Sequence, residues 1–155
     1  MNTENTNWGQ SVTAVVIKDN KVLLARHTYG GGKGMLIIPG GYVEKGETPQ
    51  DAVVREFKEE TNITIQPKNI IGIRFNMRDW YVAFSADYIS GTVQSDGDEN
   101  DLVIWLYIDE ALIRDDVPEL TKSLIKSAIN GNGLEQIDYN GNNPPCSLFG
   151  VIGKG

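Results

Sequence analysis

The sequence predicts an α/β fold in which a mixed β-sheet lies between helices. β-branched and apolar runs, typical of strands, occur both before and after one well-specified amphipathic helix, and a second helical pattern follows them. Strands around a helix, with another helix at the end, favour helix–sheet–helix layering. The chain has 155 residues with 40% hydrophobic content, which fits a single domain (1–155) with a core of about 12–130 and a Gly/Asn/Pro-rich C-terminal tail at 131–155.

The first strands are predicted at Ser11–Lys18 and Lys21–His27, because both runs are rich in β-branched and apolar residues. Asp19-Asn20 between them suits a tight hairpin turn. A Gly-rich loop at Tyr29–Gly34 then leads into a short apolar strand at Met35–Ile38.

A helix is predicted from Pro49 to Thr61. Thr48 is a good N-cap, Pro suits the first helical position, and Asp51 stands three residues after the cap, as in a capping box. Asn62 follows the last turn, where a left-handed residue is favoured and Asn is tolerated. The helix therefore has a start and a stop signal of its own.

Further strands are predicted near Ile70–Asn76 and Tyr81–Ser90, followed by an acidic loop at Ser95–Asp101 and a strand at Leu102–Ile108. Val117–Asn130 has the pattern of a last helix, with Asp116 near its cap and Gly131 after its end. The apolar stripe of this helix is Leu120, Leu124, Ile125 and Ala128. The apolar segment Ser147–Ile152 is expected to dock on the rest of the chain.

Composition limits the partners. The formal net charge of −7 argues against broad nucleic-acid binding, which needs a basic surface. A lone Cys146 excludes a disulfide framework within the chain. No apolar stretch reaches membrane-spanning length and the polar start does not resemble a signal peptide, so a cytoplasmic protein is expected.

Three glutamates dominate the predicted helix. Glu56, Glu59 and Glu60 are spaced i, i+3, i+4, which places them within an arc of roughly 100° on one face. Like charges this close repel, at a cost of a few tenths of a kcal/mol per pair. A hard cation such as Mg²⁺ or Mn²⁺ reverses that cost, because these ions prefer carboxylate oxygens. A solvated acidic face is the alternative interpretation, but it does not account for the nearby Gly-Gly loop, the helix cap and Arg55 together.

The same segment resembles the Nudix box, G-x5-E-x7-R-E-U-x-E-E-x-G-U, where U is a bulky aliphatic residue. Two positions depart from the pattern: Phe57 is aromatic, and Asn62 replaces the usual Gly. Both concern packing or backbone shape and remove no carboxylate. The matching residues are Gly41, Glu47, Arg55, Glu56, Glu59, Glu60 and Ile63.

The resemblance implies a Nudix-type α/β/α sandwich over about residues 12–130 and the hydrolysis of a pyrophosphate bond in a nucleoside diphosphate linked to another moiety. It implies Mg²⁺ or Mn²⁺ as cofactor, bound by Glu56, Glu59, Glu60 and the Gly40 backbone. Glu56 is by resemblance a candidate base, Glu59 belongs to the catalytic set, and Arg55 is expected to orient Glu47 or Glu56. Gly41 allows close approach of the substrate.

Other candidates are weighed against plain structural roles. Glu99, with Asp98 and Asp101 as rivals, is the choice for a further metal ligand, since the family often supplies one from this loop; a solvated loop is the alternative. Arg26 and His27 are candidates for substrate contact or surface roles. Phe75, Trp80 and Tyr81 flank a turn and could stack on a base, with core packing or a dimer contact as the alternative.

Two questions stay open from the sequence. A Nudix-like domain can bind a nucleotide and regulate a partner without turnover, although the intact carboxylate set argues against this alternative. The group attached to the diphosphate is not specified, and the resemblance allows a homodimer as well as a monomer.

Overall fold

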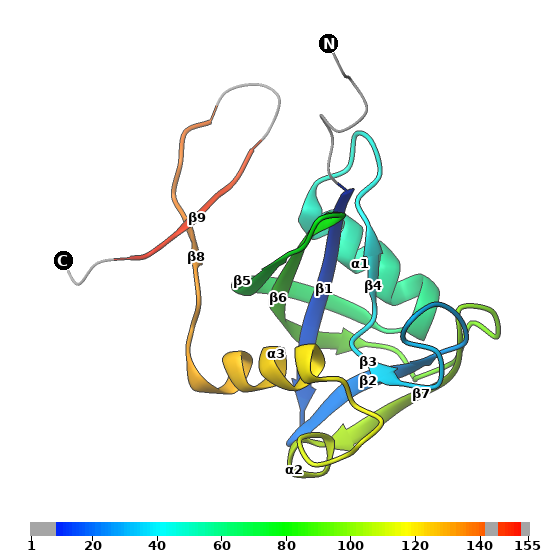
Figure 1. Ribbon diagram of the computed structural model, residues 1–155. Coiled ribbons are helices and arrows are strands. Elements are labelled where there is room, and N and C mark those ends of the chain that lie inside the picture. The colour runs from blue at the N-terminus through cyan, green and yellow to red at the C-terminus, as the bar shows by residue number, and fades with distance from the viewer. Residues whose placement is uncertain (1–8, 142–145, 153–155) are drawn as a thin grey trace.

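The computed structural model describes residues 9–141 and 146–152, and a twisted mixed sheet with a helix on each face forms its centre (Figure 1). The strands are β1 (Gly9–Lys18), β2 (Lys21–His27), β3 (Leu36–Ile37), β4 (Gly40–Tyr42), β5 (Thr64–Phe75), β6 (Asp79–Ser90), β7 (Asn100–Tyr107), β8 (Glu135–Ile137) and β9 (Leu148–Gly150). The helices are α1 (Pro49–Thr61), α2 (Ile108–Ala111) and α3 (Glu119–Asn130).

Strand β1 is the centre of the sheet, whose order is β3-β2-β1-β6-β5. It runs parallel to β6, and the pairs that β1 forms with β2 and β4 are antiparallel. β4 pairs with the first half of β1 and β2 with its last residues, while β7 pairs with β2. The predicted mixed sheet is therefore confirmed.

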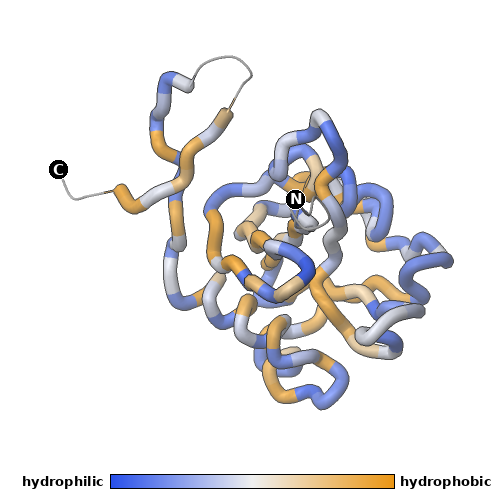
Figure 2. The backbone as a smooth tube through the Cα atoms, turned by 45° about the horizontal axis from the view of Figure 1, so that its top comes forward, coloured by the Kyte–Doolittle hydropathy of each residue, from blue (hydrophilic) through white to orange (hydrophobic). Residues whose placement is uncertain are grey.

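The two faces of this sheet carry separate hydrophobic cores. Val12, Ala14 and Val16 of β1 pack with Phe57 of α1 in one core. Val15 packs in the other with the buried residues of α3. Alternate residues of a strand point to opposite faces, so one central strand serves both layers and the predicted helix–sheet–helix order is confirmed. Figure 2 shows hydrophobic segments along the inner strands and hydrophilic segments along many of the outer loops.

Some predicted boundaries were wrong. β5 begins at Thr64, six residues before the predicted Ile70, because the strand continues through Pro67 with bulges between Pro67 and Gly72. Both residue types interrupt a strand pattern in sequence. At the other end, β7 stops at Tyr107 and Ile108 already opens the short helix α2.

The last helix also differs from its prediction. It begins at Glu119 after Pro118, and Asp116 does not cap it but forms a two-point ion pair with Arg114, at 2.8 Å for each bond. Leu120, predicted in the apolar stripe, is 38% exposed, whereas Thr121 is buried. Leu124 and Ile125 are buried as predicted, and Thr121 lies between them on the helix surface, so Leu120 falls at the edge of the buried face.

The predicted docking of Ser147–Ile152 holds for Phe149, whereas Leu148, Val151 and Ile152 are exposed. The C-terminal tail forms the β8–β9 hairpin, and Phe149 lies edge-on to Phe84 of the α1-side core with ring centroids 5.9 Å apart. The Ser147 hydroxyl also accepts a hydrogen bond of 3.0 Å from Gln50 of α1. Within the described ranges, no helix has the length and apolar character needed to span a bilayer.

We expect Asn62→Gly to leave stability nearly unchanged and Asn62→Val to lower it by about 1 kcal/mol or more. Asn62 has φ 65°, as predicted, and its backbone N–H donates to the Lys58 carbonyl to end α1. Gly adopts this conformation freely, but a β-branched residue resists it. Chemical denaturation of the two variants measures the difference; equal stabilities would contradict this account of the cap. The Asn62 side chain also donates to the Thr92 carbonyl at 3.0 Å in an exposed position. Both variants lose this hydrogen bond, so it does not affect the difference in stability between them.

Candidate active site

Helix α1 is held by local signals at both ends and by its apolar face. The Thr48 hydroxyl accepts a hydrogen bond from the Asp51 backbone N–H at 3.1 Å, and Pro49 is the first helical residue. Val53 and Phe57 are fully buried against the sheet. The helix therefore cannot rotate without losing its core contacts, and its glutamates keep a fixed direction.

The backbone of β4 lies directly against these glutamates. The Gly40 N–H donates to a Glu60 carboxylate oxygen at 3.1 Å. A Cβ on Gly41 would stand 2.5 Å from the Glu56 carboxylate, and one on Gly40 would stand 2.1 Å from the Val12 carbonyl oxygen. Contacts that short require a shift of the neighbours, so the two glycines permit a backbone approach that other residues would block.

Arg55 is the cation of the cluster. Its guanidinium makes a two-point ion pair with Glu47, at 2.7 and 3.0 Å. The same group donates to Glu56 at 2.9 Å and to Glu59 at 3.3 Å, and to the Tyr42 carbonyl at 3.1 Å. These bonds raise the pKa of Arg55 and lower the pKa of Glu47. Arg55 therefore contacts both glutamates, Glu47 and Glu56, that the sequence offered as alternatives.

Glu60 is the most buried glutamate of the cluster, with only 4% of the residue exposed. Burial, a hydrogen bond with Glu99 and the charge of Glu56 raise the pKa of Glu60 to about 9. Burial likewise raises the pKa of Glu56, although Arg55 opposes that shift. Buried carboxylates so arranged are costly as anions without a cation.

Among the acidic residues proposed for the loop, Glu99 reaches the helix carboxylates and Asp101 does not. The Glu99 carboxyl lies within hydrogen-bonding reach of Glu60. Asp101 instead pairs with Arg26 at 2.7 Å. Buried Asn100 fixes the loop by donating to the Glu60 backbone carbonyl at 2.9 Å. Sequence reasoning missed Asn100, since an Asn in an acidic loop carries no signal of burial.

The donor set suits a hard divalent cation. All the side-chain donors are carboxylate oxygens, the ligands that Mg²⁺ and Mn²⁺ prefer. In the described part of the chain, however, no three Asp, Glu, His or Cys side chains already surround one point. Glu56 and Glu59 are turned to Arg55 instead. Binding an ion therefore requires Glu59 to leave Arg55, whereas Glu56 can keep one oxygen on Arg55 and offer its other oxygen to the metal.

The two predicted substrate contacts, Arg26 and His27, have different partners in the structure. Arg26 follows the buried Ala25 near the end of β2, and its half-buried side chain pairs with Asp101. His27 stacks on Tyr29, with ring centroids 5.5 Å apart and an interplanar angle of 19°. Partial burial raises the pKa of Tyr29, and the charges of Glu99, Glu60 and Glu56 raise it further. Tyr29 thus belongs beside the carboxylates, although the sequence placed it only in a Gly-rich loop.

The aromatic residues of the β5–β6 hairpin do not form one surface. Phe75 pairs with Trp80 across the strands and meets it edge-on at 4.9 Å, and both are exposed. Tyr81 is the next residue along β6, so it points to the other face and packs against the α3-side core. The three residues predicted to flank one turn are therefore divided between two faces of the sheet.

Comparisons with known proteins agree with this geometry. The profile of the NUDIX domain family matches residues 8–126. The chain is 44% identical over 63 residues to an ADP-ribose pyrophosphatase of Methanocaldococcus jannaschii, covering 41% of this chain and 37% of that protein. It is 32% identical over 118 residues to an NAD-capped RNA hydrolase NudC of Photorhabdus laumondii, covering 72% and 44%. The chain thus spans less than half the length of these two relatives.

A solved structure gives the same result for the fold. A NUDIX hydrolase from Nitrosomonas europaea superimposes with a TM-score of 0.72 at 26% identity, covering 82% of this chain and 92% of that one. Its fold is therefore shared over the sheet and the helices that flank it. With the family profile covering most of the sequence, the chain belongs to the NUDIX domain family.

Proposed function

We propose that the chain hydrolyses a pyrophosphate bond in a nucleoside diphosphate linked to another moiety, with Mg²⁺ or Mn²⁺. One observation carries the proposal: Glu56 and Glu60 of α1 meet Glu99 of the acidic loop beside the backbone of Gly40 and Gly41. This arrangement concentrates negative charge in a partly buried place where a divalent cation and an anionic diphosphate can neutralise one another.

Each residue of the cluster has its own role in the proposed hydrolysis. Glu56, Glu59, Glu60 and Glu99 would hold the cation, and the Gly40 carbonyl would add a neutral oxygen. A bound ion would lower the pKa of water and neutralise phosphate oxygens. Glu56 accepts the proton of the attacking water, and burial, which raises its pKa, makes it a better proton acceptor than an exposed carboxylate. Arg55 fixes the orientation of Glu56 through its own anchor on Glu47.

The names of the relatives support the substrate class. One is called an ADP-ribose pyrophosphatase and the other an NAD-capped RNA hydrolase, and ADP-ribose and NAD both contain a nucleoside diphosphate. We propose that class for this chain without choosing one member. A cytoplasmic location and a homodimer stay predictions.

A panel of nucleoside diphosphate derivatives tests the proposal. Each compound is incubated with the protein and Mg²⁺, and a phosphatase that acts only on monoesters then releases inorganic phosphate from the products. Phosphate release that needs both protein and Mg²⁺ supports hydrolysis. Saturable binding of a nucleotide without any phosphate release would instead support the regulatory, non-catalytic alternative.

We expect Glu99→Gln to lower turnover at least about tenfold while the melting temperature changes little. Glu99 supplies a carboxylate from outside the helix, and loss of a group that orients or binds a metal typically costs 10–100-fold. Asp98→Asn and Asp101→Asn are matched controls, because both remove a neighbouring exposed charge of the same loop, and the Asp101 carboxylate pairs with Arg26. Turnover that falls in either control but not in Glu99→Gln would assign the loop ligand to the wrong residue.

A further inference from the structure

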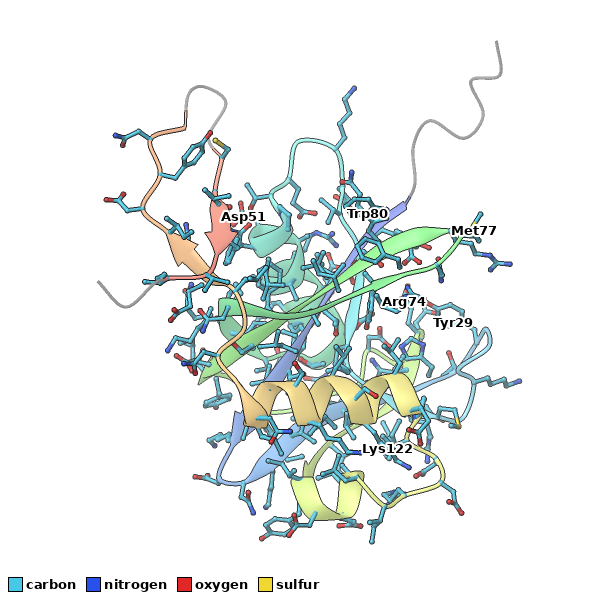
Figure 3. The ribbon with its side chains drawn as sticks, turned by 60° about the vertical axis from the view of Figure 1, so that its left-hand side comes forward. Tyr29, Asp51, Arg74, Met77, Trp80 and Lys122 are labelled. Carbon is cyan, nitrogen blue, oxygen red and sulfur yellow. The ribbon has the colours of Figure 1, made fainter. Side chains whose placement is uncertain are left out.

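A polar group of four side chains lies on the α3-side face of the sheet, where that face extends beyond the hydrophobic core. Ser11 of β1 and Arg74 of β5 are the register partners of Tyr81 on either side of β6. Asp79, two residues before Tyr81, points to the same face. In Figure 3, Arg74 is labelled at the end of the molecule where Trp80 and Met77 also lie.

The guanidinium of Arg74 is held on one edge and covered on one face. It donates to Asp79 at 2.8 Å, and Asp79 in turn accepts a hydrogen bond of 2.5 Å from the Ser11 hydroxyl. The central carbon of the guanidinium lies 5.1 Å from the ring centroid of Tyr81. The edge contact and the ring together fix the plane of the group, which is the condition for a flat binding surface.

The guanidinium of Arg74 is not fully paired or covered by the described residues. The Arg74 side chain remains 31% exposed. Its Nε–H is buried and has no acceptor among the described residues. Buried donors are almost always paired. A fixed, partly exposed guanidinium whose Nε–H has no acceptor among the described residues is therefore suited to a further partner.

Hydrogen bonds and backbone neighbours connect Tyr81 of this polar group to the carboxylate Glu60. The Tyr81 hydroxyl lies within hydrogen-bonding reach of Thr13. The Thr13 hydroxyl donates to the Pro39 carbonyl at 2.6 Å, and the next residue, Gly40, donates to Glu60. Ser11 and Thr13 are two residues apart on β1, a separation of about 7 Å. One nucleotide is long enough to bridge such a distance from a metal-bound phosphate.

We propose that Arg74 is the platform on which the nucleobase of the substrate stacks, with Tyr81 beneath it and Asp79 locking its plane. The inference rests on the proposed function. Guanidinium planes and aromatic rings both stack on bases. Because Asp79 already neutralises Arg74, a flat neutral group suits the site better than a second phosphate. Tyr81, a predicted base contact, then acts through Arg74, and Phe75 on the opposite face takes no part.

Steady-state kinetics of Arg74→Lys test the platform. Lys keeps the charge facing Asp79 but loses the flat face. With a nucleoside diphosphate sugar, KM should rise about tenfold at unchanged kcat, since stacking on one base contributes about 1–3 kcal/mol. With ribose 5-diphosphate, which has no base, both constants should stay at the wild-type values. Arg78→Lys, an exposed position of the same hairpin, is the matched control.

Binding of nucleoside monophosphates tests the platform without hydrolysis. Calorimetry with AMP, GMP, CMP and UMP in Mg²⁺ should show binding to the wild type and about tenfold weaker binding to Arg74→Lys. Asp79→Asn, which loosens the plane but keeps a polar partner, should show a smaller loss. Equal binding by wild type and Arg74→Lys, no binding by the wild type, or an equal rise in KM for the base-free substrate would overturn the proposal. Binding that depends on Arg74 in a protein that hydrolyses nothing would support the platform and reject the proposed hydrolysis.

Discussion

Glu60→Gln is expected to abolish metal-dependent hydrolysis and to stabilise the metal-free protein. The substitution removes a ligand charge from the most buried carboxylate of the cluster, and we expect turnover to fall at least about 100-fold. The same charge is a liability without the ion, because the Gly40 N–H is a weak substitute for a cation. Activity and stability should therefore move in opposite directions.

The sign of the stability effect follows from the pKa of Glu60, which the fold raises to about 9. A carboxyl group with a raised pKa takes up a proton on folding, so the metal-free wild type loses stability as the pH rises from about 4.5 toward 9. Glu60→Gln has no such loss. At pH 7 and above, the gain should be at least about 1 kcal/mol, or about 2–4 °C in melting temperature.

Thermal unfolding in chelator at several pH values measures this gain. Glu119→Gln, an exposed glutamate in the first turn of α3, is the matched control and should change neither activity nor stability. A Glu60→Gln variant with wild-type turnover, or one that is less stable than the wild type at every pH, would contradict the assignment of Glu60 as a buried ligand.

Arg55→Gln should have the largest effect on stability. Arg55 is the shared partner of Glu47, Glu56 and Glu59. Removing it leaves the first two, which are only 15% and 13% exposed, without their cation. Breaking a buried ion pair from one side costs about 3–5 kcal/mol, and partial exposure of this site reduces the expected loss to about 2 kcal/mol.

Added Mg²⁺ should restore part of that loss. In Arg55→Gln the carboxylates no longer have an internal cation, so the ion should raise the melting temperature more than it does in the wild type. Turnover should still fall, because Glu56 loses its anchor. Lys58→Gln, which removes an exposed cation from the same helix, serves as control. If the two variants lost equal stability, or if Mg²⁺ had the same effect on Arg55→Gln as on the wild type, Arg55 would not be the internal counter-ion.

The parts of the structure that the sequence predicted well are those specified locally. The bounds of α1 agree with the prediction because Thr48, Pro49 and Asn62 act within one turn of the helix ends. The positive φ angles of Asp19 and Asn20 likewise fit a tight turn set by two residues. In both cases the signal and the structure that it specifies are neighbours in the chain.

The parts that it missed depend on distant contacts. Pro67 lies within β5 because the bulged strand keeps its pairing with β6 on both sides of the irregularity. Leu120 is exposed because it lies at the edge of the buried face of α3, whose Leu124 packs close to Gly72, where a Cβ would stand 2.7 Å from the Leu124 side chain. Neither arrangement has a signature within its own segment.

The candidate site shows the same division. The spacing of Glu56, Glu59 and Glu60 was readable, since a helix converts spacing into direction. In the acidic loop, by contrast, only the fold decides that Glu99 approaches Glu60 while Asp101 pairs with Arg26. The separation of Phe75 from Tyr81 also required the register of β5 against β6.

Hydrolysis in ¹⁸O-labelled water tests the central claim most directly. The claim is that the α1 glutamates and a divalent ion direct water onto a phosphorus atom of the diphosphate. Mass spectrometry should find the label in one of the two phosphomonoester products, only when Mg²⁺ or Mn²⁺ is present, and not with Glu60→Gln. Products that carry no label would contradict the account. So would labelling in chelator, or with Glu60→Gln, that equals the labelling by the wild type with the metal ion.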